Sequence, residues 1–320
     1  MQSFLELDYK DPTSRSRPVR PTGIRGAAGS SLLHDHRKDP AQRKTPPHPL
    51  PEHPVKPLSV VVICCNEAHR IGACLASVSW ADEIVVVDSF SSDATVEIAG
   101  RYTDKVYRHE WRGYGPQKGL ALSYASHEWV LSLDADEVVS PELAAEIQAL
   151  LSGSPRYSAY RMPRMSFYLG RYLSHCWYPD YKVRLFSARA ARWDGSRLHE
   201  GVLIDGPIGT LKGNLLHYSF PTLEDHIATI QEYTSLAAGE LSRHKRPFLL
   251  LKLVGSPLVM FFKLYVVKRG FLDGVPGLVA SVLSAFHEFV KYAKYYELRL
   301  SAVRPLEDKR REARPTEPGA

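Results

Sequence analysis

Short apolar runs of strand length alternate with segments of helix length from Leu58 to about residue 151, and this alternation limits the folds open to the chain. The runs are continuous and rich in Val and Ile, as expected of strands buried on both faces. Buried strands that alternate with helices predict an α/β fold with a mostly parallel sheet wound by helices. Strands are expected at 58–65, 83–87, 105–108 and 129–133, and helices at 67–78, 91–102, 116–126 and 141–151.

The two ends of the chain have different patterns. Residues 1–57 hold ten of the 23 prolines and no apolar run, which predicts a disordered basic tail without a signal peptide. The four cysteines lack metal-site spacing, so we expect reduced thiols and a cytoplasmic protein. Beyond residue 154, short strand-like pieces are expected at 157–163, 182–186 and 210–218, and long helices at 247–268 and 275–300.

The net charge of +6 is unevenly distributed along the chain. Residues 1–57 carry +4, residues 58–153 carry −8 and residues 154–320 carry +10. A nucleic-acid-binding protein would explain the basic ends but would leave the acidic middle without a role. We therefore expect no nucleic acid partner and look for a ligand site in the acidic, sheet-forming part.

Asp134 and Asp136 follow the expected strand 129–133 directly. In an extended backbone, residues i and i+2 point to the same side, so both carboxylates can face one ligand. A hard cation such as Mg²⁺ or Mn²⁺ removes the repulsion between them and accepts phosphate oxygens as further ligands. The alternative is a solvated acidic turn. Asp88, which ends another strand of the same sheet, favours a metal-dependent diphosphate site, whereas Asp93 and Thr95 are expected to begin a helix.

Three strand ends, taken in order, resemble those of glycosyltransferase family 2. They are Asn66-Glu67, the segment 85–95 around Asp88, and the segment 131–137 around Asp134 and Asp136. The segments 117–122 and 181–186, Trp193 and His199-Glu200 are similar to the bacterial lipopolysaccharide-core β-1,4-glucosyltransferase branch. The resemblance covers about residues 57–300 and implies a GT-A fold that binds a nucleotide sugar. Residues 57–153 would be its nucleotide-sugar-binding half and residues 154–245 its acceptor-binding half.

The resemblance also implies roles for single residues. Asp88 would contact the uracil of a UDP-sugar, with Asn66 and Glu67 beside it. Asp136 would bind the metal most directly, and Asp134 would lie near the ribose and the metal.

Two further residues are open to two interpretations. Lys118 would reach the diphosphate, or it is a solvated helix residue. His217, at the end of an expected strand, is a third metal ligand or diphosphate contact, or it is a structural histidine.

Transfer of a sugar needs a base, because a hydroxyl is a poor nucleophile until a positioned carboxylate takes its proton. Glu200 is the first candidate and Asp180 the second, and Arg184 either contacts phosphate or holds Glu200. The metal would neutralise charge on the departing UDP. The predicted function is therefore metal-dependent, inverting transfer of a hexose, with glucose preferred, from a UDP-sugar to an anionic glycolipid such as the lipopolysaccharide inner core.

Residues 246–300 are predicted to form amphipathic helices that associate with the inner face of the cell membrane, before a disordered tail at 301–320. The stretch 248–267 is long enough to span a bilayer, but Lys252, Ser256 and Lys263 share one of its faces. A polar stripe on an apolar helix is typical of an interfacial segment. A polar face opposite an apolar one is also expected on the last helix: Ser284, His287, Glu288, Lys291 and Lys294 against Val279, Leu283, Phe286 and Val290. Packing of both helices on the core, or one true span, are the alternatives.

An NAD(P)-dependent oxidoreductase with a Rossmann-like domain is the main alternative from another class. Gly113, Gly115 and Gly119 open a helix, but their spacing departs from the dinucleotide-binding pattern and the preceding strand is short and polar. A D-x-D phosphatase would carry its acidic pair after the first strand rather than the fourth. The transferase is the favoured interpretation.

Overall fold

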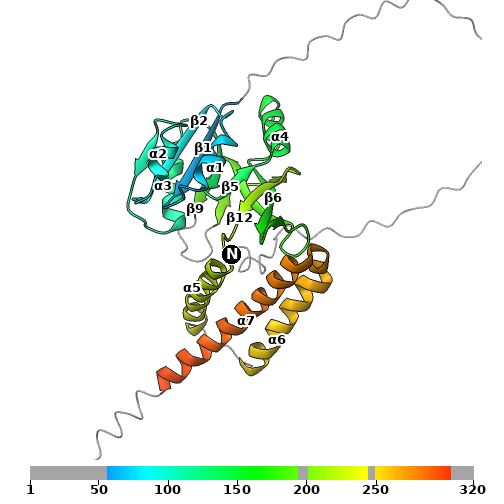
Figure 1. The fold of residues 1–320 in the computed structure, drawn as a ribbon. Helices are drawn as coiled ribbons and strands as arrows, with labels where there is room; N and C mark the ends of the chain where they lie inside the picture. Colours follow the sequence, from blue (N-terminus) through cyan, green and yellow to red (C-terminus); the bar gives the residue numbers. More distant parts are fainter. Residues whose placement is uncertain (1–55, 194–200, 244–248, 304–320) are drawn as a thin grey trace, which may run out of the picture.

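A computed structural model describes residues 56–193, 201–243 and 249–303 of the chain (Figure 1). Its centre is one sheet that runs in the order β3-β2-β1-β4-β8-β6-β12-β5, with β7 and β11 paired to β6. The strands are β1 (Leu58–Cys64), β2 (Glu83–Asp88), β3 (Val106–Arg108), β4 (Trp129–Asp134), β5 (Glu137–Val139), β6 (Ala159–Tyr168), β7 (Arg171–Tyr172), β8 (Asp180–Ser187), β11 (Ile208–Thr210) and β12 (Leu215–Tyr218). A separate small ribbon pairs β9 (Ala191–Trp193) with β10 (Val202–Ile204).

The first half of the sheet is parallel and covered on both faces. Val60 of β1 lies opposite Ile84 of β2 and Leu131 of β4, so alternate side chains point to opposite faces. One face packs on α1 (Ile71–Ala76), α2 (Thr95–Ala99) and α4 (Pro141–Ser152), and the other on α3 (Tyr114–Ser123) and the β9–β10 ribbon. The α/β fold predicted from the alternation of strands and helices is confirmed.

The second half of the sheet departs from the prediction of a mostly parallel arrangement. β8 pairs antiparallel with both β4 and β6, and β5 pairs antiparallel with β12. The expected helices at 67–78 and 91–102 are also shorter in the structure, since turns occupy the residues before Ile71 and Thr95. Those turns connect the carboxyl ends of β1 and β2 to the helices, and they carry several of the predicted site residues.

Three helices follow the sheet and form a layer beside it (Figure 1). They are α5 (Leu223–Ser242), α6 (Leu249–Phe262) and α7 (Gly274–Val303), with a π-helical turn at Lys263–Val267 and a 3-10 turn at Gly270–Asp273 between the last two. Both α5 and α6 pack on α7. The sequence analysis missed α5, although Thr222 and Asp225 form a capping box at its start. The predicted tails at 1–56 and 301–320 lie almost entirely outside the described residues.

Candidate active site

The loops after β1 and β2 are tied together at the carboxyl edge of the sheet. The Oδ1 of Asn66 accepts a hydrogen bond from the Ser92 N–H at 2.8 Å, and the Asn66 N–H donates to the Ser91 Oγ at 2.8 Å. The next N–H along, that of Glu67, donates to the Thr95 Oγ1 at 2.8 Å. These bonds fix the backbone of both loops where a ligand would lie at the end of the sheet.

Asp88 is fully buried at the end of β2, and both of its carboxylate oxygens have protein partners. Ser91 donates to the carboxylate through its N–H and its hydroxyl, and the Arg108 Nε lies 3.3 Å from it. The Arg108 guanidinium also lies 5.2 Å from the ring centroid of Phe90, a side chain that is more than half exposed. The structure therefore brings Asp88 close to Asn66, as predicted, and adds Phe90 as an exposed ring beside them.

Asp134 is held between two buried cations. The Lys118 Nζ lies 2.8 Å from one carboxylate oxygen, and an Arg184 guanidinium N–H donates to the other. Burial alone would raise the pKa of Asp134, but Arg184 and Lys118 hold that pKa well below its usual range. Lys118 is 2% exposed and its ammonium lies 5.6 Å from the ring centroid of Trp193. The alternative that Lys118 is a solvated helix residue is therefore wrong.

Asp136 lies against His217 from the far half of the sheet. The His217 Nε2 is 3.2 Å from an Asp136 carboxylate oxygen, and the Tyr218 N–H donates to the Asp136 carbonyl at 3.0 Å. On its other side, the His217 Nδ1 bonds the Ser219 Oγ at 2.8 Å. Burial and the charge of Arg164 lower the pKa of His217, which favours the neutral imidazole that binds metals.

The residues present fit a hard divalent cation. The Asp136 Oδ1 is buried and has no hydrogen-bond partner among the described residues, so one oxygen is left for a ligand. The carboxylate oxygen suits Mg²⁺ or Mn²⁺, and a histidine nitrogen whose other ring nitrogen is already bonded can be a further ligand to a transition metal such as Mn²⁺. Within the described ranges, no group of three or more His, Cys, Asp or Glu side chains is placed to hold a metal ion, and Asp134 is ion-paired with Arg184. Phosphate oxygens and water would have to complete the coordination of such an ion.

A buried network behind this site was missed by the sequence analysis. Glu137 is fully buried and accepts hydrogen bonds from both Arg164, at 3.2 Å, and Arg184, at 2.6 Å. It also accepts the Asp134 N–H at 3.1 Å, so one carboxylate orients the turn that carries both predicted metal-site aspartates. The available signal was a third acidic residue directly after Asp136 and two arginines, Arg161 and Arg164, within the segment that forms β6.

Of the two candidate bases, only Asp180 lies within the described residues. Arg164 donates to one of its carboxylate oxygens through Nε at 3.0 Å and through NH2 at 2.8 Å. Burial raises the pKa of Asp180, but Arg164 and Lys182 outweigh it and the net pKa is lowered. A carboxylate in such a pair is a weak proton acceptor. Glu200 lies in the segment 194–200, outside the described residues.

Glu67 completes the acidic edge beside the predicted metal pair. Its pKa is raised to about 6, because burial and the charge of Asp136 raise it more than the ion pair with Arg70 at 3.1 Å lowers it. Burial and the charge of Asp136 both disfavour the ionised form of Glu67. A cation bound near the carboxylates of Glu67 and Asp136 would therefore be favoured.

A hollow of about 420 Å³ adjoins this edge. Its lining includes Asp136, Arg70 and the aromatic rings of Phe167, Tyr218 and Phe220. Flat aromatic rings beside a charged group provide both apolar contact and orientation for a ring-shaped ligand.

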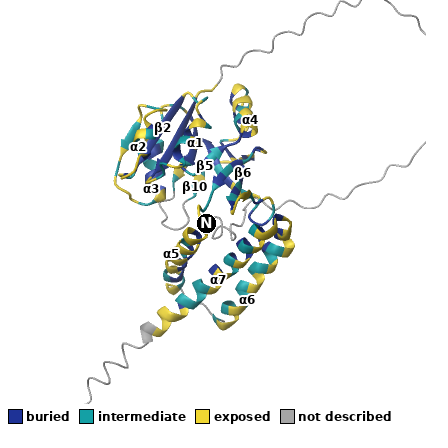
Figure 2. Ribbon diagram, viewed as in Figure 1, coloured by how far each residue is buried: buried dark blue, intermediate teal, exposed yellow. Residues whose placement is uncertain are grey.

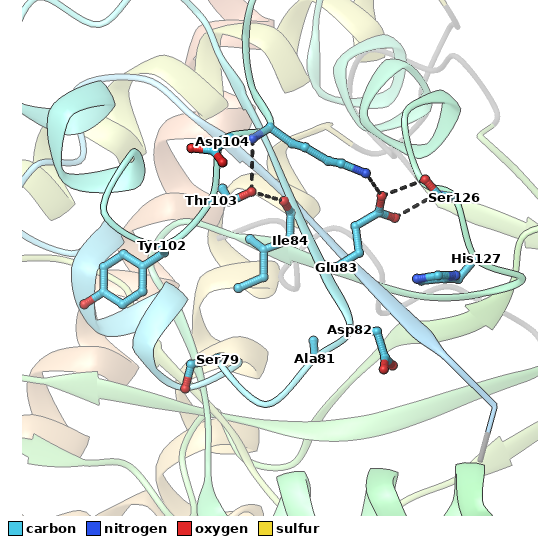
Figure 3. Close-up of a pocket in the computed structure, with 11 residues that line it drawn as sticks. Ser79, Ala81, Asp82, Glu83, Ile84, Tyr102, Thr103, Asp104, Ser126 and His127 are labelled. Atoms are coloured by element: carbon cyan, nitrogen blue, oxygen red, sulfur yellow. Dashed lines mark hydrogen bonds and ion pairs between the residues drawn. The ribbon is translucent and has the colours of Figure 1, made fainter. Parts of the chain in front are cut away.

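A second hollow, of about 460 Å³, lies at the other end of β2 (Figure 3). Its lining includes Asp82, Glu83 and Ser126, and Glu83 is ion-paired with Lys105 there. Because Glu83 begins β2 and Asp88 ends it, this hollow is separated from the carboxyl edge by a strand of roughly 16 Å. It is not part of the site described above.

Comparisons with known proteins show which family the chain resembles. The profile of "Glycosyl transferase family 2" matches residues 59–186. The chain is 31% identical over 264 residues to the lipopolysaccharide core biosynthesis glycosyltransferase LpsC of Rhizobium meliloti (strain 1021), an alignment that covers 80% of this chain and 97% of that protein. It is 33% identical over 261 residues to the uncharacterized glycosyltransferase RT0209 of Rickettsia typhi (strain ATCC VR-144 / Wilmington), covering 78% and 89%.

Among solved structures, S. aureus TarS 1–349 in complex with UDP-GlcNAc is similar with a TM-score of 0.40 at 14% identity, over 77% of this chain and 92% of that one. Identity to LpsC over most of both chains shows that this protein belongs to glycosyltransferase family 2. It is an enzyme of the glycosyltransferase class, with the GT-A type of α/β fold that the sequence predicted. The oxidoreductase alternative is wrong.

Proposed function

We propose that the chain is a metal-dependent, inverting hexosyltransferase that moves a hexose, with glucose as the first to test, from a UDP-sugar to a membrane glycolipid. The observation that carries the proposal is the pairing of Asp136 with His217 next to Asp134 at the carboxyl edge of the sheet. An acidic edge repels a diphosphate unless a cation lies between them. Asp136 and His217 would hold Mg²⁺ or Mn²⁺, which supplies charge neutralisation at the leaving diphosphate.

We assign the donor to the loops that follow β1, β2 and β4. We assign the uracil and ribose to the side of Asn66, Glu67 and Asp88, whose loops are hydrogen-bonded to one another. Lys118 lies 2.8 Å from Asp134, so its ammonium can be shared between that carboxylate and the diphosphate. The buried ion pairs of Asp134 hold its side chain in place, which supports the proposal that it lines the donor site.

We propose Glu200 as the base and rank Asp180 below it, because Asp180 already pairs with Arg164. In the transfer step the base takes the proton of the acceptor hydroxyl as its oxygen forms a bond to the anomeric carbon. The bond from that carbon to the β-phosphate oxygen breaks, and UDP leaves with the electron pair. Attack opposite the leaving group inverts the anomeric configuration.

The acceptor side is assigned to residues 154–245. The hollow next to Asp136 takes Phe167, Tyr218 and Phe220 from this part of the chain, and aromatic faces suit the apolar face of a sugar ring. Residues 154–320 carry a net charge of +10, which favours an anionic acceptor. Because LpsC bears the name of a lipopolysaccharide core glycosyltransferase, we propose the phosphorylated inner core as the acceptor and the cytoplasmic face of the inner membrane as the location.

Calorimetric titration of the full chain with UDP tests the donor and metal assignments together. We expect UDP to bind with Mn²⁺ present and to lose most of its affinity in EDTA, while NAD does not bind in either condition. UDP binding that is unchanged in EDTA would contradict metal dependence. A screen of UDP-hexoses with inner-core lipopolysaccharide, read as UDP release, then tests the acceptor and donor sugar.

A further inference from the structure

In its first half, helix α7 turns polar side chains toward the protein and several large apolar side chains outward. Ser281, Ser284, His287 and Glu288 are all buried, with at most 9% of each exposed. On the outer face, exposed fractions of 40% to 47% are found for Leu278, Val282 and Phe286. A surface helix of a water-soluble domain shows the opposite distribution. The helix thus packs on the catalytic domain through Ser281 and Ser284 and leaves this apolar face exposed.

Helix α6 continues this apolar exposure. Val254, Leu258 and Phe262 recur every fourth residue and are 55% to 62% exposed, and no residue of α6 is buried. The stretch Leu249–Val267 has a mean hydropathy of 1.7, long and apolar enough to cross a membrane, yet only 6% of it is buried in the protein. A core helix with such a composition would be mostly buried. Figure 2 shows α6 and the outer part of α7 in the colours of exposed and intermediate residues.

The inner side of α7 is covered by helix α5 and not by lipid. On the inner side, the Lys294 Nζ of α7 donates to the Thr234 and Ser235 hydroxyls of α5, at 2.9 and 2.8 Å. α5 exposes four acidic side chains, which do not belong in hydrocarbon. They are Glu224, Asp225, Glu232 and Glu240.

The turn between α6 and α7 is fixed to the catalytic domain rather than free to reach the far side of a bilayer. The carboxylate of Asp273, fully buried, accepts the N–H groups of Ser174, His175 and Cys176 at 2.8 to 3.1 Å. A spanning hairpin would carry its turn across the membrane, whereas this turn lies against the segment between β7 and β8. The contacts favour helices that lie in the plane of the membrane surface.

We propose that Val254, Leu258, Val259 and Phe262 of α6, together with Leu278, Val282 and Phe286 of α7, form a lipid-facing surface that lies in the headgroup boundary of an anionic membrane. Residues 249–303 contain seven Lys or Arg and three Asp or Glu, and two of those acids, Asp273 and Glu288, are buried. Positive charge around an apolar face suits anionic lipid headgroups. A second copy of this chain would instead bring two positive surfaces together.

Binding to vesicles tests the surface without donor or acceptor. The proposal rests on the proposed function only in assigning a membrane glycolipid as acceptor, so vesicle binding and sugar transfer can fail independently. The full chain is floated with vesicles of phosphatidylcholine and phosphatidylglycerol. We expect V259E/V282E to lower the bound fraction about tenfold, because Val259 (68% exposed) and Val282 face the lipid. The matched control L236E, on the exposed face of α5, should bind as the natural protein does.

Variants V259E/V282E must still bind UDP with Mn²⁺, which excludes misfolding as the cause of lost vesicle binding. If V259E/V282E and L236E bound vesicles equally, the proposal would be overturned. Self-association of the natural protein in place of vesicle binding would also overturn it.

Depth is measured with an environment-sensitive dye on Val259→Cys or Val282→Cys in a Cys65→Ser background, Cys65 being exposed. Lipids spin-labelled near the headgroup should quench the dye more than lipids labelled near the chain end. Stronger quenching by lipids labelled near the chain end would indicate a spanning hairpin and would also overturn the proposal.

Discussion

The imidazole Nε2 of His217 lies 3.2 Å from a carboxylate oxygen of Asp136, although the two residues come from opposite halves of the domain. The sheet makes this contact: β12 pairs antiparallel with β5, and His217 is opposite Glu137, the neighbour of Asp136. The Nδ1 of the imidazole bonds the Ser219 hydroxyl, and its Nε2 therefore points at the carboxylate.

Removing either member of this pair should abolish metal-dependent donor binding. For Asp136→Asn and for His217→Ala we expect the affinity for UDP in Mn²⁺ to fall at least about tenfold, toward the value in EDTA, as for loss of one metal-site partner. The measurement is the same calorimetric titration. Glu224→Gln, an exposed acid on α5, is the matched control and should leave affinity unchanged. Undiminished affinity in His217→Ala would assign that histidine to the fold rather than to the metal.

Glu137 should matter for stability more than any exposed acidic residue. Its replacement in Glu137→Gln leaves Arg164 and Arg184 buried with one anionic partner fewer. Breaking a buried ion pair typically lowers the free energy of unfolding by about 3 kcal/mol or more. Urea unfolding followed by circular dichroism measures the change.

The control for Glu137 is Glu97→Gln, which removes a surface pair with Arg101, both side chains being more than 60% exposed. Such a pair contributes roughly 0–1 kcal/mol. If both variants lost the same small amount, the buried network would not stabilise the turn that carries Asp134 and Asp136.

Local pattern was enough to predict the parallel half of the sheet. The strands that contain Val60, Val86 and Leu131 are mostly apolar. Acidic residues lie at their carboxyl ends: Glu67 shortly after β1, Asp88 at the end of β2 and Asp134 at the end of β4. Asn66 and Asp88 were placed correctly next to each other because parallel strands end at one edge.

The second half could not be predicted the same way, because its pairing depends on contacts distant in sequence. β8 and β12 each carry polar side chains that look solvent-facing when taken alone, yet Arg184 and His217 are buried in the structure. The polar face of α7 depends on distant contacts in the same way, since Ser284 and His287 are buried against protein. The predicted roles of Asn66, Glu67, Asp88 and Lys118 in donor binding stay predictions.

Acid should weaken the contact between the sheet and the helical layer through His226. This imidazole is 2% exposed, bonds the Tyr168 hydroxyl at 2.8 Å and stacks on Phe220 with centroids 4.1 Å apart. Burial and the nearby His287 lower its pKa to about 4 from an unfolded value near 6.5. Its contribution to the free energy of unfolding is thus complete above pH 6.5 and is lost as pH falls through about 4.

The loss attributable to His226 is about 3 kcal/mol across that interval. Urea unfolding between pH 4 and 7 should therefore show a shallower pH dependence for His226→Gln than for the natural protein. His69→Gln, at an exposed histidine, should leave the slope as it is. Identical slopes in all three proteins would mean that His226 titrates alike folded and unfolded.

The two candidate bases, Glu200 and Asp180, can be told apart by the turnover and the stability of their variants. Glu200→Gln should bind UDP with Mn²⁺ as the natural protein does and should lose turnover by at least about a hundredfold, since general base catalysis contributes roughly 10²–10⁴-fold. Asp180→Asn removes a partner of the buried Arg164, so we expect it to lower the free energy of unfolding, which Glu200→Gln should leave nearly unchanged. Turnover is read as UDP release from UDP-glucose with inner-core lipopolysaccharide, and stability by urea unfolding. A stable, active Glu200→Gln would transfer the role of base to Asp180, and its ion pair with Arg164 would then have to open during the reaction.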